Sequence, residues 1–318
     1  MNSQLDQAIA TKIDEILLKA QVSTEMIHLI KTSLNADSKN GELFKWAHLT
    51  LMNCECVSGE MDVALPGAIA MELSALAADI FDDIQDQDND DLPWRQIPNA
   101  NALNLAICLS MLSGKALSAL LDDEDNRLFK EVSQTLTHMW VTASDAQFQE
   151  SLFDTRQQVE LDQYFELVRR KSGSLTACAC KLGAILGGAS ESIVLQLEEF
   201  GTNLGIMSQI RNDLKDFLNF EDKKDFVNNR KTLPYVYLLN ILQGKKAEQF
   251  RELIRFEGKG PREFEKEEQD LLKQLTLDEG AVHYGKVMYD IFRQKSMEII
   301  QAIPVPGKRK EKMIELVE

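Results

Sequence analysis

Two stretches of the chain concentrate oxygen-bearing side chains at spacings that suit metal binding. The first, residues 82–91, reads DDIQDQDNDD and holds six aspartates directly behind the apolar run ALPGAIAMELSALAADIF. On a helix, side chains at i and i+4 share one face and i+1 lies one step around it, so Asp82, Asp83 and Asp86 are predicted to project together. Asp88 lies at the end of this row. Mg²⁺ prefers oxygen ligands, and it would neutralise the repulsion among these carboxylates.

The second stretch, GIMSQIRNDLKDF at residues 205–217, repeats this arrangement. Asn212, Asp213 and Asp216 stand at i, i+1 and i+4, and Gln209 lies one turn earlier on the same face. Taken alone, an acidic run is more often a solvated loop, and the second stretch suits an exposed helix face equally well. Each motif predicts the other, however. Two helices with matching faces are expected to hold Mg²⁺ around a diphosphate, because Mg²⁺ commonly completes its shell with water and phosphate oxygens.

The elements that must position these side chains are predicted to be helices throughout. Only seven prolines occur, and the interval between Pro98 and Pro234 has none and is rich in good helix formers. Alternating strand patterns with turn dipeptides are scarce. The sequence therefore predicts an all-α protein. Helices are expected at 3–19, 24–35, 42–57, 66–88, 99–121, 125–143, 146–171, 173–188, 191–219, 231–243, 246–256, 262–274, 279–302 and 307–317.

No linker is long or polar enough to divide the chain, so the sequence predicts a single helical domain over residues 1–318. Its core is expected at about 40–240, followed by C-terminal helices at 241–318. The stretch FEGKGPREFEKEEQD is interpreted as an exposed, charged connection. The basic tail PGKRKEK, residues 306–312, either closes over a diphosphate or is a solvated charge run, and the second interpretation is preferred.

Composition excludes several classes of function. The 318-residue chain is 44% hydrophobic and 27% charged, with a net charge of −16 and a pI near 4.8. This acidity disfavours nucleic acid and anionic membranes as partners, because both bind basic surfaces. Five cysteines without zinc-type spacing, and no leader pattern at the N-terminus, predict a reduced cytoplasmic protein. The longest apolar stretch is interrupted by Glu72 and Asp79, which favours a core helix over a membrane span.

The paired acidic stretches resemble the two aspartate-rich motifs of trans-isoprenyl diphosphate synthases, DDxxD or DDxxxxD followed by DDxxD. Further elements of that family match in order from about residue 40 to 240: Glu72, Gln147 and Glu150 in AQFQE, Lys171-Ser172-Gly173 in RRKSGSL, Gln209, and Arg230-Lys231-Thr232 in NNRKTLP. The resemblance implies a helical bundle of the isoprenoid synthase type with a central apolar cavity. It also implies an isoprenyl transferase that acts on an allylic diphosphate, uses up to three Mg²⁺ ions and forms a homodimer.

The same resemblance assigns roles to individual residues. The catalytic carboxylates would be Asp82, Asp83, Asp86, Asp213 and Asp216, with Asp88 and Asn212 as additional metal ligands. The diphosphate would be bound by Lys171, Gln209, Arg230, Lys231 and Arg95. The prenyl pocket would be lined by Ala77, Ala78, Gln147 and Phe81. Because the two alanines lie one turn before Asp82 and leave room there, a donor of at least geranyl length is expected.

Departures from the family pattern point to one diphosphate rather than two. Elongating members carry GGKRxRP before the first motif, and its Lys and Arg hold a second diphosphate. The two candidate segments here, 58–62 and 41–43, lack that Lys-Arg pair. The two arginines that follow the first motif are reduced to Pro93-Trp94-Arg95, and Asn212 replaces the first aspartate of the second motif. An acceptor without a phosphate is therefore expected.

The segment SGEMDVA followed closely by DIFDDIQDQDN resembles the ComQ-type isoprenyl transferases of bacilli. That subgroup attaches a geranyl or farnesyl group to a tryptophan of the peptide pheromone precursor ComX, in quorum sensing and competence. The resemblance supplies this acceptor, which residue spacing does not show. Two alternatives remain: a prenyl chain-elongation synthase that uses isopentenyl diphosphate, and a catalytically silent helical partner. A terpene cyclase is a third.

Overall fold

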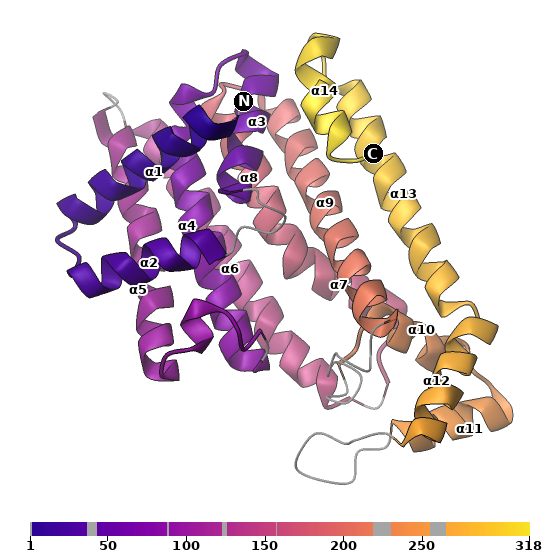
Figure 1. Ribbon diagram of the computed structural model, residues 1–318. Helices are drawn as coiled ribbons and strands as arrows, with labels where there is room; N and C mark the ends of the chain where they lie inside the picture. The colour runs from indigo at the N-terminus through magenta and orange to yellow at the C-terminus, as the bar shows by residue number, and fades with distance from the viewer. Residues whose placement is uncertain are drawn as a thin grey trace. The chain divides into compact units, whose positions relative to one another are not determined.

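The computed structural model describes residues 2–36, 43–87, 89–122, 126–156, 158–218, 230–254 and 265–318 (Figure 1). Within these ranges the regular structure is helical and contains no strand, so the predicted all-α fold is confirmed. The α-helices are α1 (Asn2–Lys19), α2 (Thr24–Ala36), α3 (Lys45–Ser58), α4 (Leu65–Asp86), α5 (Asn99–Leu117), α6 (Arg127–Asp154), α7 (Leu161–Arg170), α8 (Ser172–Leu186), α9 (Glu191–Leu218), α10 (Leu233–Ile241), α11 (Gly244–Leu253), α12 (Lys266–Asp278), α13 (Ala281–Ala302) and α14 (Gly307–Glu315). Short 3₁₀ helices are η2 (Asp62–Ala64), η3 (Pro93–Arg95) and η4 (Ser118–Asp122).

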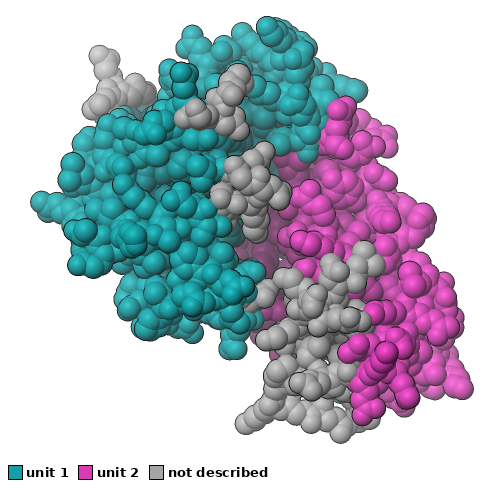
Figure 2. Space-filling view, in the orientation of Figure 1, with its two compact units in different colours: residues 1–140, 175–201, 299–316 teal, residues 141–174, 202–298, 317–318 magenta. Residues whose placement is uncertain are grey.

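The helices form two compact units (Figure 2). Unit 1 comprises residues 1–140, 175–201 and 299–316, and unit 2 comprises residues 141–174, 202–298 and 317–318. The first acidic motif therefore belongs to unit 1 and the second to unit 2. The single domain expected for residues 1–318 stays a prediction.

Helix α4 is the central apolar helix of unit 1. Its residues from Gly67 to Ala77 are all buried, and it packs against α3 and α5. Helix α8 approaches α3 closely at Gly183, where an added Cβ would lie 2.2 Å from the carbonyl oxygen of Thr50. A side chain at this position would therefore push the two backbones apart.

A buried carboxylate joins the start of α3 to α4. Phe44, the residue before α3, adopts a left-handed conformation with φ of 54° and makes no side-chain cap. Instead, Oε2 of Glu72 accepts hydrogen bonds from the backbone N–H groups of Trp46 and Ala47, at 3.0 and 2.9 Å. The negative charge of Glu72 thus satisfies donors at a helix N-terminus, where anions are stabilised.

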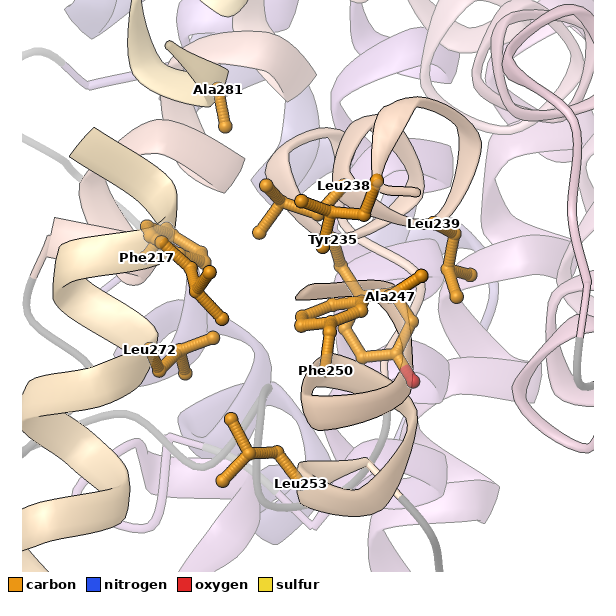
Figure 3. Packing of buried hydrophobic residues seen from close by; sticks show 11 residues of the cluster. Phe217, Tyr235, Leu238, Leu239, Ala247, Phe250, Leu253, Leu272 and Ala281 are labelled. Atoms are coloured by element: carbon orange, nitrogen blue, oxygen red, sulfur yellow. The ribbon is translucent and has the colours of Figure 1, made fainter. Parts of the chain in front are cut away.

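Unit 2 has its own apolar core around α10, α11 and α12 (Figure 3). Tyr235 and Phe250 pack edge to face with ring centroids 5.6 Å apart, and Phe217 and Leu272 are buried in the same cluster. Phe217 lies near the end of α9, which carries the second acidic motif, and Tyr235 lies in α10, which follows the Arg230 segment. This core therefore packs these two helices together.

Two boundaries differ from the sequence prediction. Helix α6 continues without a break through residues 144–145, and the chain instead leaves the helix after Asp154. There the N–H groups of Thr155 and Arg156 bond three residues back, which tightens the last turn. Glu160 then starts α7 with a reciprocal capping box to Gln163, so the predicted single helix at 146–171 is wrong.

The basic tail, residues 306–312, is largely exposed, which agrees with the preferred interpretation as a solvated charge run. It forms α14, which packs on α3. Nζ of Lys312 bonds the carboxylate of Glu55 at 2.6 Å, and the guanidinium of Arg309 donates to the carbonyl of Val57 at 3.0 Å. These contacts anchor the basic side chains within unit 1.

Two helices, Asp62–Asp86 and Asn99–Leu121, have the length and apolar composition of a membrane span. Most of the first is buried inside the protein, as expected for a core helix. Length and composition alone are a weak indication, because buried helices of water-soluble proteins share them.

Candidate active site

The first acidic motif lies at the C-terminal end of α4. Asp82 and Asp86 are partly exposed, whereas Asp83 is only 7% exposed. The helix ends where Gln87 adopts a left-handed conformation and its N–H bonds the carbonyl of Asp83. Asp82 and Asp86 therefore share an accessible face one turn apart. Asp88, also predicted to bind metal, lies outside the described residues.

Asp83 is engaged by the turn that follows the helix. Its Oδ2 accepts a 2.8 Å hydrogen bond from Nε1 of Trp94, and its Oδ1 accepts a 2.6 Å hydrogen bond from Nδ2 of Asn89. Trp94 is 1% exposed. The carboxylate of Asp83 thus ties the Pro93–Arg95 turn to the end of α4.

Arg95, predicted to bind diphosphate, is held within its own loop. Its guanidinium lies 3.2 Å from the carboxylate of Asp90 and donates to Oδ1 of Asn99 at 3.4 Å. The side chain is 9% exposed, while that of Asp90 is 75% exposed. These contacts make Arg95 part of the loop that follows the first motif, and its role toward a diphosphate stays a prediction.

The second motif, in α9, shows the same pattern. Asp213 is 3% exposed, Asn212 is exposed and Asp216 is partly exposed. Oδ2 of Asp213 accepts 2.6 Å hydrogen bonds from the hydroxyl of Tyr164 and from the backbone N–H of Leu233. Its Oδ1 accepts from Nε2 of Gln209 at 2.8 Å.

The two motifs therefore correct one expectation from helix geometry. The oxygen-bearing side chains at i and i+4 do share an accessible face, but the carboxylate at i+1, Asp83 or Asp213, is turned into the protein and bonded there. The reason is that i+1 lies about 100° around the helix from i. A neighbouring element can cover that side while the i and i+4 side chains remain partly accessible.

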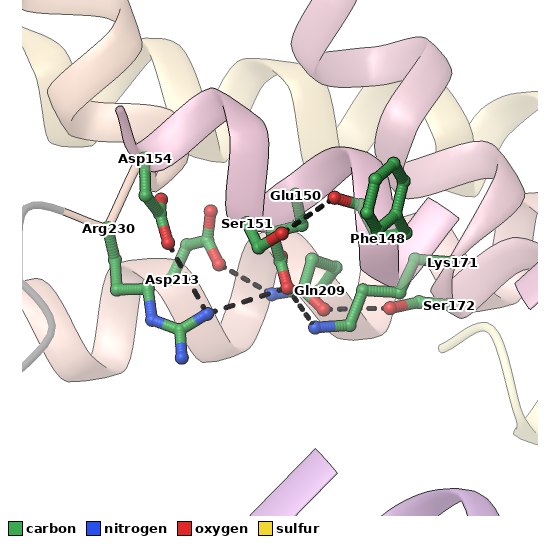
Figure 4. Close-up of polar contacts among 9 residues, drawn as sticks. All are labelled: Phe148, Glu150, Ser151, Asp154, Lys171, Ser172, Gln209, Asp213 and Arg230. Atoms are coloured by element: carbon green, nitrogen blue, oxygen red, sulfur yellow. Dashed lines mark hydrogen bonds and ion pairs between the residues drawn. The ribbon is translucent and has the colours of Figure 1, made fainter. Parts of the chain in front are cut away.

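A cluster of cations lies in unit 2 near the second motif (Figure 4). Nζ of Lys171 contacts Oε2 of Glu150 at 2.5 Å, and the guanidinium of Arg230 lies 3.5 Å from the same oxygen. Arg230 also lies 3.7 Å from Oδ2 of Asp154. Glu150 and Asp154 stand one turn apart on α6, so one helix face holds both predicted diphosphate ligands.

Lys231 is the third cation of this region and is 9% exposed. Its ammonium lies 3.3 Å from the hydroxyl of Tyr235 and 4.5 Å from the centroid of that ring. Burial lowers the pKa of Lys231 to about 8, against the opposing effect of Asp154. Burial also raises the pKa of Asp154 to about 6, while Arg230 acts to lower it.

Gln209 connects the second motif to the Lys171 segment. Its Oε1 accepts a 2.8 Å hydrogen bond from the hydroxyl of Ser172, while its Nε2 donates to Asp213. Figure 4 shows these side chains as a continuous polar row. The structure thus brings together Lys171, Gln209, Asp213 and Arg230, which the sequence places in three separate segments.

The predicted prenyl-pocket residues are divided between the units. On α4, Ala77 is fully buried, whereas Ala78 and Phe81 are partly exposed, and Phe81 meets Trp140 edge to face at 6.4 Å. Gln147 is partly exposed and belongs to unit 2. The surface beside the first motif is therefore small at Ala78 and aromatic at Phe81.

Sequence reasoning missed four side chains that shape this region: Trp94, Asp154, Tyr164 and Tyr235. Tyr164 lies seven residues before Lys171, and nothing in its spacing marks it as a partner of Asp213. The sequence places Trp94 only beside Arg95, where the family pattern has two arginines. A tyrosine or tryptophan expected to be buried is the available signal, because a buried phenol or indole usually finds a hydrogen-bond partner.

The donor chemistry fits a hard divalent cation. Asp82 with Asp86, and Asn212 with Asp216, each present oxygen atoms one turn apart on a partly accessible helix face. Carboxylate and amide oxygens are the ligands that Mg²⁺ accepts, usually with waters and phosphate oxygens completing the shell. The cations Lys171, Arg230 and Lys231 suit the phosphate itself.

A helical fold with pairs of carboxylate or amide side chains near two helix ends, and with a cluster of cations, is typical of enzymes that handle diphosphates. The chain belongs to the polyprenyl synthetase family, whose family model matches residues 34–271. It is an isoprenyl transferase acting on allylic diphosphates, in the trans-isoprenyl diphosphate synthase superfamily. Solved structures share the helical fold: a polyprenyl synthetase from Streptomyces coelicolor A3(2) aligns with a TM-score of 0.83 at 22% identity, over 99% of this chain and 97% of that one.

Curated relatives fall into two groups of similar identity. The tryptophan prenyltransferase ComQ of Bacillus subtilis (strain 168) is 28% identical over 281 residues, 86% of this chain and 87% of that protein. The geranylgeranyl pyrophosphate synthase of Geoglobus acetivorans is also 28% identical, over 309 residues, 92% of this chain and 90% of that protein. Identity alone therefore does not choose between a tryptophan acceptor and chain elongation.

Proposed function

We propose that the protein transfers a geranyl or farnesyl group from its diphosphate to a tryptophan of a small peptide pheromone precursor of the ComX type, in quorum sensing and competence. The observation that carries this proposal is the turn after the first motif. Its Trp94 is buried on Asp83, and its Arg95 is paired with Asp90. This turn therefore offers less cationic surface to a second diphosphate than the arginine pair of the elongating pattern.

The reaction begins with cleavage of the allylic C–O bond, and the electron pair leaves with the diphosphate oxygen. Bound Mg²⁺ would neutralise this charge from the carboxylate pairs Asp82 and Asp86, and Asp216 with Asn212. Lys171 and Arg230 would donate hydrogen bonds to the departing oxygens, since fixed donors act most strongly where charge develops. Indole C3 of the acceptor then bonds the allylic carbon. Because C3 of a tryptophan carries the side chain and no hydrogen, the positive charge passes to the ring nitrogen, which loses its proton to diphosphate or water.

The deciding experiment incubates the protein with Mg²⁺, geranyl or farnesyl diphosphate and a tryptophan-containing precursor peptide. Mass spectrometry should show the mass of one prenyl group on the peptide. A matched peptide with phenylalanine in place of tryptophan should stay unmodified. Failure to label the peptide with either donor, together with efficient elongation of the donor by isopentenyl diphosphate, would replace the proposal with the elongation synthase.

The relatives that make geranylgeranyl diphosphate keep elongation as the second candidate. A silent helical partner is separated from both by measuring inorganic pyrophosphate release from geranyl diphosphate. Mg²⁺-dependent release in the presence of either acceptor supports an enzyme, whereas no release with any acceptor supports the silent partner. The Asp86→Asn variant is the matched control, because it keeps the helix and removes one carboxylate.

We further propose that the enzyme works in the cytoplasm as a homodimer. On α5, Leu103, Ile107 and Met111 lie one turn apart and are 40%, 51% and 68% exposed. An apolar stripe of this kind on a helix is typical of a surface that binds another apolar surface. The family resemblance indicates that the partner of this stripe is a second copy of the chain.

A further inference from the structure

Asp213 is the common acceptor for three different elements of unit 2. It receives hydrogen bonds from Tyr164 in α7, from Gln209 one turn earlier in α9, and from the backbone N–H of Leu233. The side chain is 3% exposed. Both oxygens are therefore committed to protein donors, which is how a buried carboxylate is normally satisfied.

One of these bonds fixes the cation-bearing segment before α10. Leu233 is the first residue of α10, and the residue before it, Thr232, makes no side-chain cap of its own. Asp213 thus supplies the anionic cap for this helix, and the dipole of the helix N-terminus favours a negative charge there. Because Arg230 and Lys231 directly precede this cap, its position determines where their side chains begin.

The other bonds reach the Lys171 segment. Gln209 is oriented by donating to Asp213, which leaves its Oε1 to accept from Ser172, the neighbour of Lys171. Tyr164 lies in α7, which ends at Arg170 immediately before Lys171. Asp213 therefore anchors both chain segments that carry the predicted diphosphate ligands.

We propose that Tyr164 and Asp213 are positioning residues that hold the Lys171 and Arg230 segments in the geometry that binds the diphosphate. Metal binding by the second motif then falls to Asp216 and Asn212. This inference rests on the diphosphate binding that belongs to the proposed function, and it is independent of the acceptor.

The hydrogen bond between Tyr164 and Asp213 is buried and involves a charged acceptor. Tyr164 is buried, and burial together with the neighbouring Asp213 carboxylate raises its pKa well above the ordinary value. The phenol donates to a carboxylate, and a hydrogen bond to a charged acceptor is stronger than one between neutral groups.

The test compares Tyr164→Phe with Tyr237→Phe by calorimetric titration of the full-length protein with inorganic pyrophosphate at several Mg²⁺ concentrations. Tyr237 is a suitable control because its hydroxyl also bonds within unit 2, to the carbonyl of Glu279, and not to Asp213. We expect Tyr164→Phe to weaken the affinity for pyrophosphate about tenfold, because one hydrogen bond to a charged group is lost. The Mg²⁺ concentration at half-saturation should stay unchanged. Tyr237→Phe should leave both unchanged.

Two further variants keep the inference falsifiable if Tyr164→Phe folds poorly. Asp216→Asn should raise the Mg²⁺ concentration at half-saturation. Asp213→Asn should weaken the binding of pyrophosphate and leave the Mg²⁺ concentration at half-saturation unchanged. The inference fails if Asp213→Asn shifts the Mg²⁺ dependence as much as Asp216→Asn does, or if Tyr164→Phe binds pyrophosphate like the wild type. Because pyrophosphate binding involves no acceptor, a wrong assignment of the peptide substrate leaves these outcomes unaffected.

Discussion

The indole N–H of Trp94 donates a 2.8 Å hydrogen bond to the buried carboxylate of Asp83. This contact links a turn that follows the first acidic motif to the motif itself. It leaves Asp82 and Asp86 as the accessible carboxylates at the end of α4. The resemblance to the elongating pattern predicts two arginines after the first motif, where this chain has Pro93-Trp94-Arg95. The indole N–H of Trp94 is a donor to the protein itself.

Replacing Trp94 with Phe should destabilise the protein. The buried Asp83 loses the hydrogen bond from the indole N–H, and an under-satisfied buried acceptor costs about 1–3 kcal/mol. Urea unfolding should show this loss in the free energy of unfolding. Trp46→Phe is the matched control, because Nε1 of Trp46 is buried and has no hydrogen-bond partner among the residues that the structure describes. Equal losses in the two variants would show that ring volume, and not the bond to Asp83, determines the effect.

Replacing Glu150 with Gln should strengthen pyrophosphate binding. Glu150 contacts both Lys171 and Arg230, and its carboxylate competes with a phosphate for the same donors. Removal of one negative charge from this partly buried cluster is expected to tighten binding by about three- to tenfold. Glu198→Gln, which breaks the Lys181 pair in unit 1, should have no effect on pyrophosphate. Weaker binding in Glu150→Gln would mean that Glu150 orients the cations or binds metal.

Replacing Ala78 with Phe should shorten the preferred prenyl donor. Ala78 is partly exposed one turn before Asp82, so an aromatic ring there would close space beside the first motif. The ratio of activity with geranyl diphosphate to activity with farnesyl diphosphate should rise by about tenfold or more. The reason is that the longer farnesyl chain loses the contacts of at least a few methylene groups when the pocket is blocked. Ala78→Val should shift the ratio less. An unchanged ratio in both variants would remove this face of α4 from the prenyl pocket.

Lys231 should make stability depend on pH in a defined direction. Burial lowers its pKa from the ordinary 10.5 to about 8. The folded state therefore carries the full penalty of the buried charge at lower pH, and the penalty fades as the pH rises from 8 toward 10.5. Between these values the wild type should gain up to about 1.4 kcal/mol per pH unit over Lys231→Met.

Urea unfolding of both proteins at intervals from about pH 7 to about pH 9.5 measures this difference. Lys246→Met is the control, because Glu279 raises the pKa of Lys246 above the ordinary 10.5. This lysine therefore keeps its proton in both the folded and the unfolded state throughout this pH range, and Lys246→Met should follow the pH profile of the wild type. Parallel pH profiles for the wild type and Lys231→Met would show that the lysine is not penalised by burial.

Replacing Ile107 with Lys should dissociate a dimer formed through α5. The side chain is 51% exposed in the middle of the Leu103–Met111 stripe, and a charge buried in an apolar interface is costly unless it is paired. Sedimentation equilibrium should show a shift toward monomer. Leu195→Lys changes another exposed apolar residue, 57% exposed on α9, and should leave the mass unchanged. A monomeric wild type would end the proposal outright.

The sequence alone determined the fold class and the segments that carry chemistry. Proline spacing and helix-forming composition predicted the all-α fold. The i, i+1, i+4 spacing identified the two helix segments that carry Asp82, Asp83 and Asp86, and Asn212, Asp213 and Asp216. These features are local, because helix periodicity depends only on residues a few positions apart. Lys171 and Arg230 were found by the order of motifs.

Only the tertiary structure decided which carboxylates are turned inward and what holds the cations. Nothing in the local sequence distinguishes the buried Asp83 and Asp213 from the accessible side chains of the same motifs. Their burial depends on donors from distant segments, Trp94 for one and Tyr164 with Leu233 for the other. The pairing of Lys171 and Arg230 with one helix face of α6 likewise arises from packing. Local periodicity specifies the direction in which a side chain leaves the helix axis. The residue that it contacts in that direction depends on how the rest of the chain folds.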